Sequence, residues 1–376
     1  MPPFAAEVDL AAVEGNVAEL KRRAGSAEVM AVVKADGYGH GMLPCARAAL
    51  RAGATWLGVA FVEEALALRA AGVTAPLLAW LTTPSTDLSA AAKAAVDVSI
   101  SAEWGLEAAV AAAERTGTTV RVHLKADTGL GRGGATASQW PDLCRSAGKL
   151  AAAGAIDVVG VWSHLAYADA PGHPTVAAQR ARFDEALVVA AEAGLNPQVR
   201  HLANSAATLA VPEAHYDLVR PGVAVYGLSP GADVGRAADL GLRPAMRLRA
   251  ELALVKRVPP GHGVSYGHRY TTSVDTTLAL VPLGYADGVP RNATNLAPVV
   301  IDGRRYTISG TVCMDQFVVD VGDAPVREGD TVVLFGPGDD GEPTAEDWAR
   351  AVGTINYEIV TRVGARVPRV YRGAAE

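Results

Sequence analysis

The chain has 376 residues, half of them hydrophobic and a fifth charged, and its formal net charge is −6. This balance is typical of a soluble globular enzyme with room for one large and one smaller domain, and it excludes a disordered chain. The acidic balance and the lack of a basic run argue against nucleic-acid binding. The short, interrupted apolar runs predict no membrane-spanning helix.

The cysteines and the N-terminus indicate the compartment. Cys45, Cys144 and Cys313 are widely separated and form no CxxC pair. This spacing predicts a reducing environment without a disulfide framework or a zinc site. The first residues contain no charged segment followed by an apolar core, so we expect no signal peptide and a cytoplasmic protein.

Alanine-rich helical segments alternate with short β-branched runs from about residue 10 to residue 230. The strands are expected at Met30–Val33, Trp56–Phe61, Leu77–Trp80, Val96–Ile100, Thr119–Leu124, Val158–Ser163, Gln198–Leu202 and Tyr216–Val219. The helices are expected at Ala11–Arg23, Leu43–Ala52, Glu63–Ala71, Glu103–Thr116, Thr175–Ala193 and Ala206–Val211. Eight strand–helix units predict a parallel (β/α)8 TIM-like barrel, with a doubly wound open sheet as the alternative.

The pattern changes after about residue 240, where short alternating segments are separated by turns. Strands are expected at Met246–Val258, Thr277–Leu283, Pro298–Ile301, Tyr306–Thr311, Phe317–Val321 and Thr331–Phe335, with one helix around Thr344–Val352. This pattern predicts a mainly antiparallel β-domain. We expect a barrel of residues 10–238 and a β-strand-rich domain of residues 239–376, with residues 1–9 as a candidate part of the second.

Lys34 stands where the apolar run Met30–Val33 ends in a glycine-rich turn. A lysine at the end of a buried strand loses hydration, so its pKa tends to fall and its amine becomes a nucleophile for an aldehyde. On position alone, an ordinary surface lysine is the more common case. The other polar residues at strand ends favour the nucleophile.

The ends of barrel strands are where the chemistry of this fold collects. The polar residues at these places are Lys34, Tyr38, Lys125, Asp127, Arg132, His164, His201, Asn204, Ser205 and Arg220. Ser205 precedes a helix, and Gly222 and Val223 offer free backbone N–H groups beside a turn, which predicts an anion site suited to a phosphate. An aldehyde-binding lysine, a phosphate site and an arginine together predict bound pyridoxal phosphate.

Two further patterns are weaker. Gly129–Gly134 matches G-x-G-x-x-G after a strand, but the next strand ends without the acidic residue that a ribose needs, so a dinucleotide site is disfavoured. His123, His164 and His201 are widely spaced and lack an H-E-x-x-H motif or a carboxylate-rich partner set, so we expect no metal. In the second domain, Tyr266, Tyr285 and Tyr357 lie in glycine-containing or polar turns, but spacing alone gives them no role.

Several motifs follow one another in a specific order along the whole chain. They are the segments 33–41, 123–132, 162–169, 201–205 and 366–369. Through them the chain resembles the alanine racemase family, which comprises bacterial enzymes that depend on pyridoxal 5′-phosphate. The resemblance implies a barrel with a C-terminal β-domain, and head-to-tail homodimers with shared active sites for a small amino-acid substrate.

The resemblance also implies roles for single residues. Lys34 would bind the cofactor covalently and act as one catalytic base, and Tyr266 of the partner subunit would be the opposite base. The other implied cofactor-binding residues are Tyr38, Arg132, His164, Asn204, Ser205, Arg220, Gly222, Val223 and Tyr357. The implied substrate-binding residues are Arg132 and Met314, and the implied supporting residues are Lys125, His201, Asp315 and Tyr285.

Among these, Lys125 matches a lysine that is often carbamylated and orients Arg132, and Arg220 matches the residue that faces the pyridine nitrogen. Thr311 departs from the family, because many relatives carry arginine there on the entrance side. The implied function is the two-base interconversion of L-alanine and D-alanine, which supplies D-alanine for peptidoglycan.

Alternative functions remain open at this point. A serine racemase or a broad-specificity racemase of the same fold is the nearest, and a non-enzymatic pyridoxal phosphate-binding protein belongs to a different class. A decarboxylase of similar architecture is disfavoured because Cys313–Gln316 does not match its cysteine-serine-glycine-aspartate type motif. Substrate breadth, the carbamylation of Lys125 and the strength of the dimer do not follow from the sequence.

Overall fold

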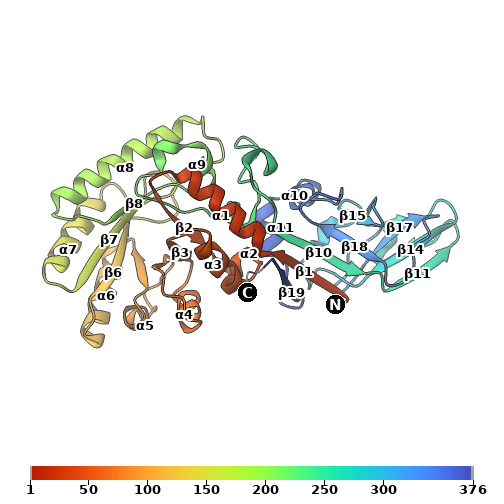
Figure 1. Ribbon diagram of the computed structural model, residues 1–376, viewed down its shortest axis with the longest axis horizontal. Coiled ribbons are helices and arrows are strands. Elements are labelled where there is room, and N and C mark those ends of the chain that lie inside the picture. The colour runs from red at the N-terminus through yellow and green to blue at the C-terminus, as the bar shows by residue number, and fades with distance from the viewer. Residues whose placement is uncertain (1, 374–376) are drawn as a thin grey trace.

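The computed structural model describes residues 2–373, in which an α/β barrel joins an elongated β-rich domain (Figure 1). The barrel strands are all parallel and are paired in the order β8-β7-β6-β5-β4-β3-β2-β9. They are β2 (Glu28–Val32), β3 (Trp56–Val59), β4 (Leu77–Ala79), β5 (Asp97–Ile100), β6 (Val120–Lys125), β7 (Ile156–Trp162), β8 (Val199–His201) and β9 (Leu218–Val219).

The barrel is nearly closed between β8 and β9. The backbone N–H of Asp217 donates to Arg200 O (3.1 Å), and that of Arg220 donates to Ala203 O (2.9 Å). β2, the first barrel strand, pairs directly with β9, the last. The predicted parallel barrel is confirmed, and the open sheet is wrong.

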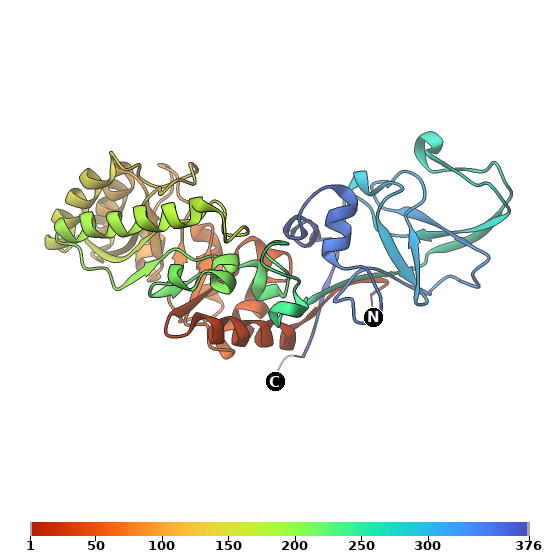
Figure 2. The same cartoon turned by 90° about the horizontal axis from the view of Figure 1, so that it is seen from above.

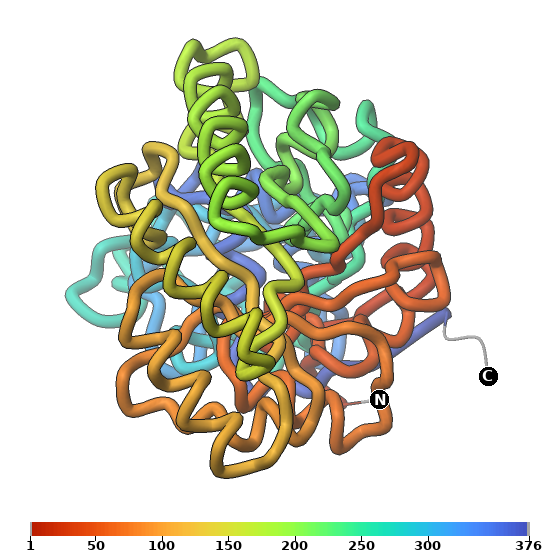
Figure 3. The backbone as a smooth tube through the Cα atoms, turned by 90° about the vertical axis from the view of Figure 1, so that its left-hand side faces the viewer, coloured from red at the N-terminus to blue at the C-terminus, as the bar shows by residue number. Residues whose placement is uncertain are grey.

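Helices surround the strands, as Figure 3 shows from the barrel end. They are α1 (Leu10–Ala24), α2 (Lys34–Tyr38), α3 (Met42–Arg51), α4 (Val62–Ala70), α5 (Ser89–Lys93), α6 (Glu103–Thr116), α7 (Trp140–Ala152), α8 (Pro174–Glu192) and α9 (Ser205–Ala210). The sequence did not single out α2, α5 or α7, and the non-helical dihedral angles inside α2 agree with the turn expected after the first strand. In α7, Gly148 lowers the helix propensity but lets the helix approach Ala193 O of the following segment, so tertiary packing decides the helix.

The second domain contains two main sheets. The larger has the order β16-β15-β18-β10-β1-β19 and the smaller β11-β14-β17, and β12 pairs only with β13. The strands are β1 (Phe4–Asp9), β10 (Met246–Glu251), β11 (Leu254–Val258), β12 (Gly263–Val264), β13 (Tyr270–Thr271), β14 (Thr276–Val281), β15 (Pro298–Ile301), β16 (Arg304–Thr307), β17 (Phe317–Gly322), β18 (Thr331–Phe335) and β19 (Arg369–Arg372). The pairing is antiparallel except between β1 and β19.

One expected strand is divided in the structure. The segment Met246–Val258 forms β10 and β11, which belong to different sheets because the chain leaves the first at Leu252 and Ala253. β1 lies between β10 and β19, so residues 4–9 are part of the β-rich sheet. The domain limits themselves stay a prediction, and residue 1 and residues 374–376 lie outside the described residues.

The last helices bring the two parts of the molecule together. α10 (Ala345–Val352) and α11 (Asn356–Thr361) lie on the barrel-facing side of the β-rich domain (Figure 2). The backbone of Gly39, in the turn after β2, approaches Val360 O of α11 so closely that a Cβ would clash. Arg369 Nε also donates to Gly39 O (2.9 Å). Among the described residues, no helix is long and apolar enough to cross a membrane.

Candidate active site

Lys34 begins a strained turn directly after β2. It is half-buried, and Ala35, Asp36, Gly37 and Tyr38 follow it with φ between 51° and 61°. Each non-glycine residue in this left-handed region costs about 1–2 kcal/mol. Such strain persists only where surrounding contacts enforce it, and it gathers at functional sites.

A second strained turn surrounds Tyr266. Of the nine non-glycine residues with positive φ in the described part of the chain, three follow Lys34 and two, Ser265 and His268, flank Tyr266. Ser265 has φ 61° and ψ −171°, a region that non-glycine residues rarely adopt. Five of these nine residues therefore lie beside the two residues expected to act as bases.

The surroundings of Lys34 favour a neutral amine. Burial and the charge of Arg132 lower the pKa of Lys34, while Glu64 acts in the opposite direction. The amine lies 5.8 Å from the ring centroid of Trp80, which directly follows β4. A neutral amine beside an apolar ring is the reactive form towards an aldehyde.

Ser205 organises the expected phosphate site. Its Oγ accepts hydrogen bonds from the backbone N–H groups of Gly222 (2.8 Å) and Ala224 (3.3 Å). The expectation that the N–H of Gly222 is free is therefore wrong, because Ser205 already receives it. No acceptor for the Ser205 hydroxyl hydrogen is found among residues 2–373, so this hydrogen is available to a ligand.

Two tyrosine hydroxyls complete this site. A Cβ on Gly222 would lie less than 3.0 Å from Tyr38 Oη, so only glycine leaves room there. The rings of Tyr38 and Tyr357 are 6.3 Å apart between centroids. Burial raises the pKa of both hydroxyls, so they remain proton donors. Serine and tyrosine hydroxyls are donors of the kind that the acceptor oxygens of a phosphate need.

Asn204 caps the helix that begins at Ser205. Its Oδ1 accepts the N–H of Ala207 (3.1 Å) and caps α9. The capping bond places Ser205 at the first position of the helix, where its side chain meets the turn at Gly222.

Arg220 is buried at the end of β9 and starts a chain of hydrogen bonds through the barrel. It donates from Nη1 to His201 Nδ1 (3.0 Å). His201 Nε2 lies 2.8 Å from His123 Nδ1, and His123 Nε2 lies 3.2 Å from Asp97 Oδ2. Arg121 Nε donates to the other oxygen of Asp97 (2.7 Å). The histidines are thus used in hydrogen bonds, and no metal-binding cluster is found among the described residues.

The direction of this chain follows from Arg220, because arginine can only donate. His201 must therefore accept at Nδ1 and donate from Nε2, and His123 must in turn donate from Nε2 to Asp97. Burial and the charge of Arg220 lower the pKa of His201 far below its ordinary value, in agreement with a neutral ring. Burial raises the pKa of Asp97, but His123 and Arg121 outweigh it, so Asp97 remains the anion at the end of the chain.

His164 and Lys125 lie in a strongly cationic region. Arg220 Nη2 donates to His164 Nδ1 (3.3 Å), which leaves the proton of His164 on Nε2. Burial and the charges of Arg220, Arg132, Lys125 and Lys34 lower the pKa of His164 far below its ordinary value. Burial, Arg132 and Arg220 lower the pKa of Lys125 to about 8, and its amine lies 4.5 Å from the ring centroid of Trp162.

The glycine-rich loop after β6 closes on itself. Asp127 Oδ1 accepts the N–H groups of Gly129 (3.0 Å), Leu130 (3.0 Å) and Gly131 (3.2 Å). These donors are not free for a pyrophosphate, which argues against the dinucleotide interpretation. The exposed Arg132 follows in the same loop.

Among residues 2–373, no hydrogen bond, ion pair or ring contact joins Lys34 to four expected residues of the second domain, which are Tyr266, Tyr285, Met314 and Asp315. Tyr266 lines one hollow together with residues of β14 and β17, and these strands lie at the end of the β-rich domain away from the barrel (Figure 1). Tyr266, Met314 and Tyr285 are 75%, 52% and 42% exposed. Asp315 is paired with Arg366 (2.8 Å). By contrast, Tyr357 of the same chain does reach Tyr38, because α11 packs against the turn after β2.

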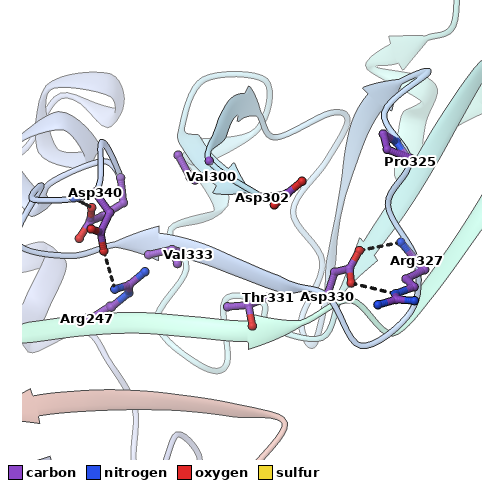
Figure 4. A pocket seen from close by; sticks show the side chains of 11 residues that line it. Arg247, Val300, Asp302, Pro325, Arg327, Asp330, Thr331, Val333 and Asp340 are labelled. Carbon is purple, nitrogen blue, oxygen red and sulfur yellow. Dashed lines mark hydrogen bonds and ion pairs between the residues drawn. The ribbon is translucent and has the colours of Figure 1, made fainter.

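The β-rich domain also contains a separate cavity of about 480 Å³ (Figure 4). It is lined by charged residues, including Arg247 and Asp340 (3.4 Å apart) and Arg327 and Asp330 (3.5 Å apart). None of the expected site residues lines it. It is therefore not the site at the barrel strand ends.

Four residues near the site were missed in the sequence. Trp80 and Trp162 stand at the ends of β4 and β7, where an inspection of every strand end could have found them. Asp97 stands at the start of a strand, and Glu64 lies inside a helix. Glu64 also completes a capping box with Phe61 at the start of α4, but only the fold brings it to the peptide after Lys34. Only the fold likewise links Asp97 to Arg220, through His123 and His201.

Models of known protein families match both parts of the chain. Residues 8–230 match the model of the alanine racemase N-terminal domain, and residues 245–371 match that of the alanine racemase C-terminal domain. The chain belongs to the alanine racemase family. The resemblance seen in the motifs is confirmed, together with the expected combination of barrel and β-domain.

Individual members of the family are similar over nearly the whole chain. The chain is 68% identical to the alanine racemase of Frankia casuarinae, over 97% of this chain and 95% of that protein. It is 54% identical to an alanine racemase structure from Streptomyces lavendulae, with TM-score 0.98 over 99% of this chain and 98% of that one. For the alanine racemase structure from Streptomyces coelicolor the identity is 57% and the TM-score 0.97, over 98% of both chains.

Proposed function

We propose that this chain interconverts L-alanine and D-alanine with pyridoxal phosphate bound at the ends of the barrel strands. The observation that carries the proposal is a half-buried lysine that begins a strained turn, whose Tyr38 lies beside Gly222 and Tyr357 while Ser205 accepts the Gly222 N–H. The names of relatives that share over half of their residues with this chain support alanine as the substrate.

The cofactor supplies, when bound, a conjugated ring system that accepts the electron pair left by the departing Cα proton. Ser205, Tyr38 and Tyr357 would bind its phosphate, with the backbone of Gly222 and Val223 beside them. Lys34 would hold its aldehyde carbon. Asn204 supports this arrangement through the cap of α9.

Racemisation needs one base on each face of the substrate. Lys34 Nζ takes or returns the proton on one face, and its lowered pKa keeps the amine available. The Tyr266 hydroxyl of the partner subunit serves the opposite face. Its exposure and its distance from the barrel end of its own chain support a shared active site in a homodimer.

Arg220 would face the pyridine nitrogen. Burial lowers the pKa of Arg220 to about 9, which still leaves the guanidinium charged at neutral pH. A charged guanidinium donates hydrogen bonds but gives up no proton, so Arg220 leaves the ring nitrogen unprotonated. His164, neutral and protonated at Nε2, is the candidate hydrogen-bond partner of the incoming Tyr266 hydroxyl.

Arg132 would bind the phenolic oxygen of the cofactor and the substrate carboxylate, with Met314 of the partner subunit at the carboxylate. Lys125 beside Arg132 places two cationic groups together. A carbamate on Lys125 would replace this repulsion with a charge-assisted pair that orients Arg132. Tyr285 and Asp315 of the partner subunit would line and support the entrance, and His201 would hold Arg220.

The product fits a supply of D-alanine for peptidoglycan, made by a cytoplasmic homodimer. The first experiment follows the chirality of alanine with the reconstituted protein, in both directions. Lys34→Ala is expected to abolish conversion and Tyr266→Phe to reduce it strongly, while the exposed Lys93→Ala changes nothing. Conversion of serine but not alanine would favour the alternative racemase, and cofactor binding without any turnover would favour a binding protein.

Mixing the two impaired variants tests the shared site separately. A mixed dimer of Lys34→Ala and Tyr266→Phe contains one site in which both residues are intact. Random pairing then restores about a quarter of the sites. If the mixture stays inactive although mixed dimers form, Tyr266 does not act across the dimer.

A further inference from the structure

Glu64 joins the turn after Lys34 to the neighbouring helix. It lies half-buried in the first turn of α4. Its Oε1 accepts the backbone N–H of Ala35 (2.7 Å), and its Oε2 accepts those of Ala60 (2.8 Å) and Phe61 (3.1 Å). One carboxylate thus connects the ends of β2 and β3, two adjacent strands of the barrel.

The bond to Ala35 acts on the backbone of Lys34 itself. The N–H of Ala35 belongs to the same peptide group as the carbonyl of Lys34, so this bond restrains the backbone from which the Lys34 side chain leaves the turn. Ala35 is also the first of five consecutive residues with positive φ, which end at Gly39. Contacts from outside the turn are needed to keep such a conformation, and Glu64 supplies one where the strain begins.

Other residues hold the later part of the turn. His40 Nδ1–H donates to Gly37 O (3.1 Å) and Tyr38 O (3.0 Å), and Asp36 Oδ1 accepts the N–H of Met42 (2.8 Å). These contacts lie beyond the Lys34–Ala35 peptide. Glu64 is therefore placed to orient Lys34 without being needed for the phosphate-binding hydroxyl of Tyr38.

We propose that Glu64 is a positioning residue that aims the Lys34 amine at the aldehyde carbon of the cofactor. The inference rests on the proposed function, because it assumes that Lys34 binds pyridoxal phosphate. In that reaction the amine nitrogen forms a bond to the aldehyde carbon. The aldehyde oxygen leaves as water with the two amine protons, and a C=N bond remains.

The test separates covalent capture from simple binding. Cofactor-free protein is mixed with pyridoxal phosphate, and borohydride added at intervals reduces the C=N bond to a stable amine that peptide mass spectrometry locates at Lys34. Binding without the covalent step is measured with pyridoxine phosphate, in which an alcohol replaces the aldehyde. The variants are Glu64→Ala and Glu64→Gln, and the exposed neighbour Glu63→Gln is the matched control.

Capture at Lys34 is expected to slow by about tenfold or more in Glu64→Ala, as for the loss of a hydrogen bond to a charged group. The capture rate of Glu64→Gln is expected to lie between those of wild type and Glu64→Ala, because an amide offers one accepting oxygen in place of two. Pyridoxine phosphate affinity is expected to stay within about twofold of wild type, since Tyr38 and Ser205 are untouched. Glu63→Gln is expected to match wild type in both measurements.

Two results would overturn the inference. Unchanged capture in both Glu64 variants would show that Lys34 needs no such support, and a parallel loss of pyridoxine phosphate binding would show that Glu64 only maintains the fold. If wild type itself forms no reducible bond at Lys34 but binds pyridoxine phosphate, the proposed function fails first and this inference with it.

Discussion

Gly222→Ala tests the phosphate site through a single methyl group. The new Cβ would lie 3.0 Å from Tyr38 Cζ and still closer to Tyr38 Oη, whereas ordinary contact begins at 3.4 Å. The backbone of Tyr38 is held in the turn after Lys34, so the ring has to tilt away from Gly222. The Tyr38 hydroxyl is then displaced from the position in which it would meet the phosphate.

The structure sets the size of the effect. A hydroxyl moved by roughly 1 Å loses a hydrogen bond that tolerates only a few tenths of an ångström. A hydrogen bond to a charged group is worth about 1.5–3 kcal/mol. The dissociation constant for pyridoxal phosphate is therefore expected to rise about 10- to 150-fold.

The assay is a titration of cofactor-free protein with pyridoxal phosphate, repeated in a Tyr38→Phe background. Gly15→Ala is the matched control, because a Cβ at Gly15 meets nothing within 4 Å. If Gly222→Ala acts through the Tyr38 hydroxyl, its penalty shrinks once that hydroxyl is gone. Wild-type affinity in Gly222→Ala, or equal penalties in both backgrounds, would refute the geometry described for this site.

Three further outcomes are expected. Asp97→Asn should lower the free energy of unfolding at neutral pH by about 1.5–3 kcal/mol, because one oxygen that accepts a charge-assisted bond becomes an amide. The pKa of Asp97 is lowered by folding, so this contribution is present above the ordinary carboxyl pKa and is lost as the pH falls through the lower folded-state value. A difference in unfolding free energy between wild type and Asp97→Asn that stays constant in chemical denaturation across acid pH would contradict it. Removal of carbon dioxide should reduce activity, and added bicarbonate should restore it. Recovery is expected to be fastest above the Lys125 pKa of about 8, where the amine is neutral. Activity that does not change with bicarbonate would argue against a carbamate. Thr311→Val removes the hydrogen bond from Thr311 Oγ1 to Tyr266 O (2.7 Å) and should lower kcat several-fold with little change in cofactor affinity, and an unchanged kcat would show that the strained turn holds without it.

Much of the barrel could be predicted because its signals are local. Each strand is a short buried run followed by an amphipathic or alanine-rich helix, and all eight expected strands are present. The ends of the strands were predicted less accurately, since β9 contains only Leu218 and Val219 of the expected Tyr216–Val219. The division of Met246–Val258 was missed because both halves have strand character, and only pairing with other strands separates them.

Lys34, Ser205 and Arg220 could likewise be chosen from the sequence, since each follows a recognisable strand. The left-handed turn after Lys34 was not foreseen, because its strain is maintained by contacts with residues distant in sequence. The same holds for the donation from Gly222 to Ser205, which joins residues 17 positions apart.

The sequence by itself thus determined the order of strands and helices, the lysine and hydroxyl residues at the strand ends, and the family to which the chain belongs. Only the tertiary structure decided that Asp97 and His123 support His201 and Arg220 from the barrel interior, and that Glu64 holds the peptide after Lys34. The physical reason is that strand and helix patterns depend on neighbouring residues. Hydrogen-bond partners across a barrel depend on which side chains face inward at matching heights, which is settled only when the sheet closes.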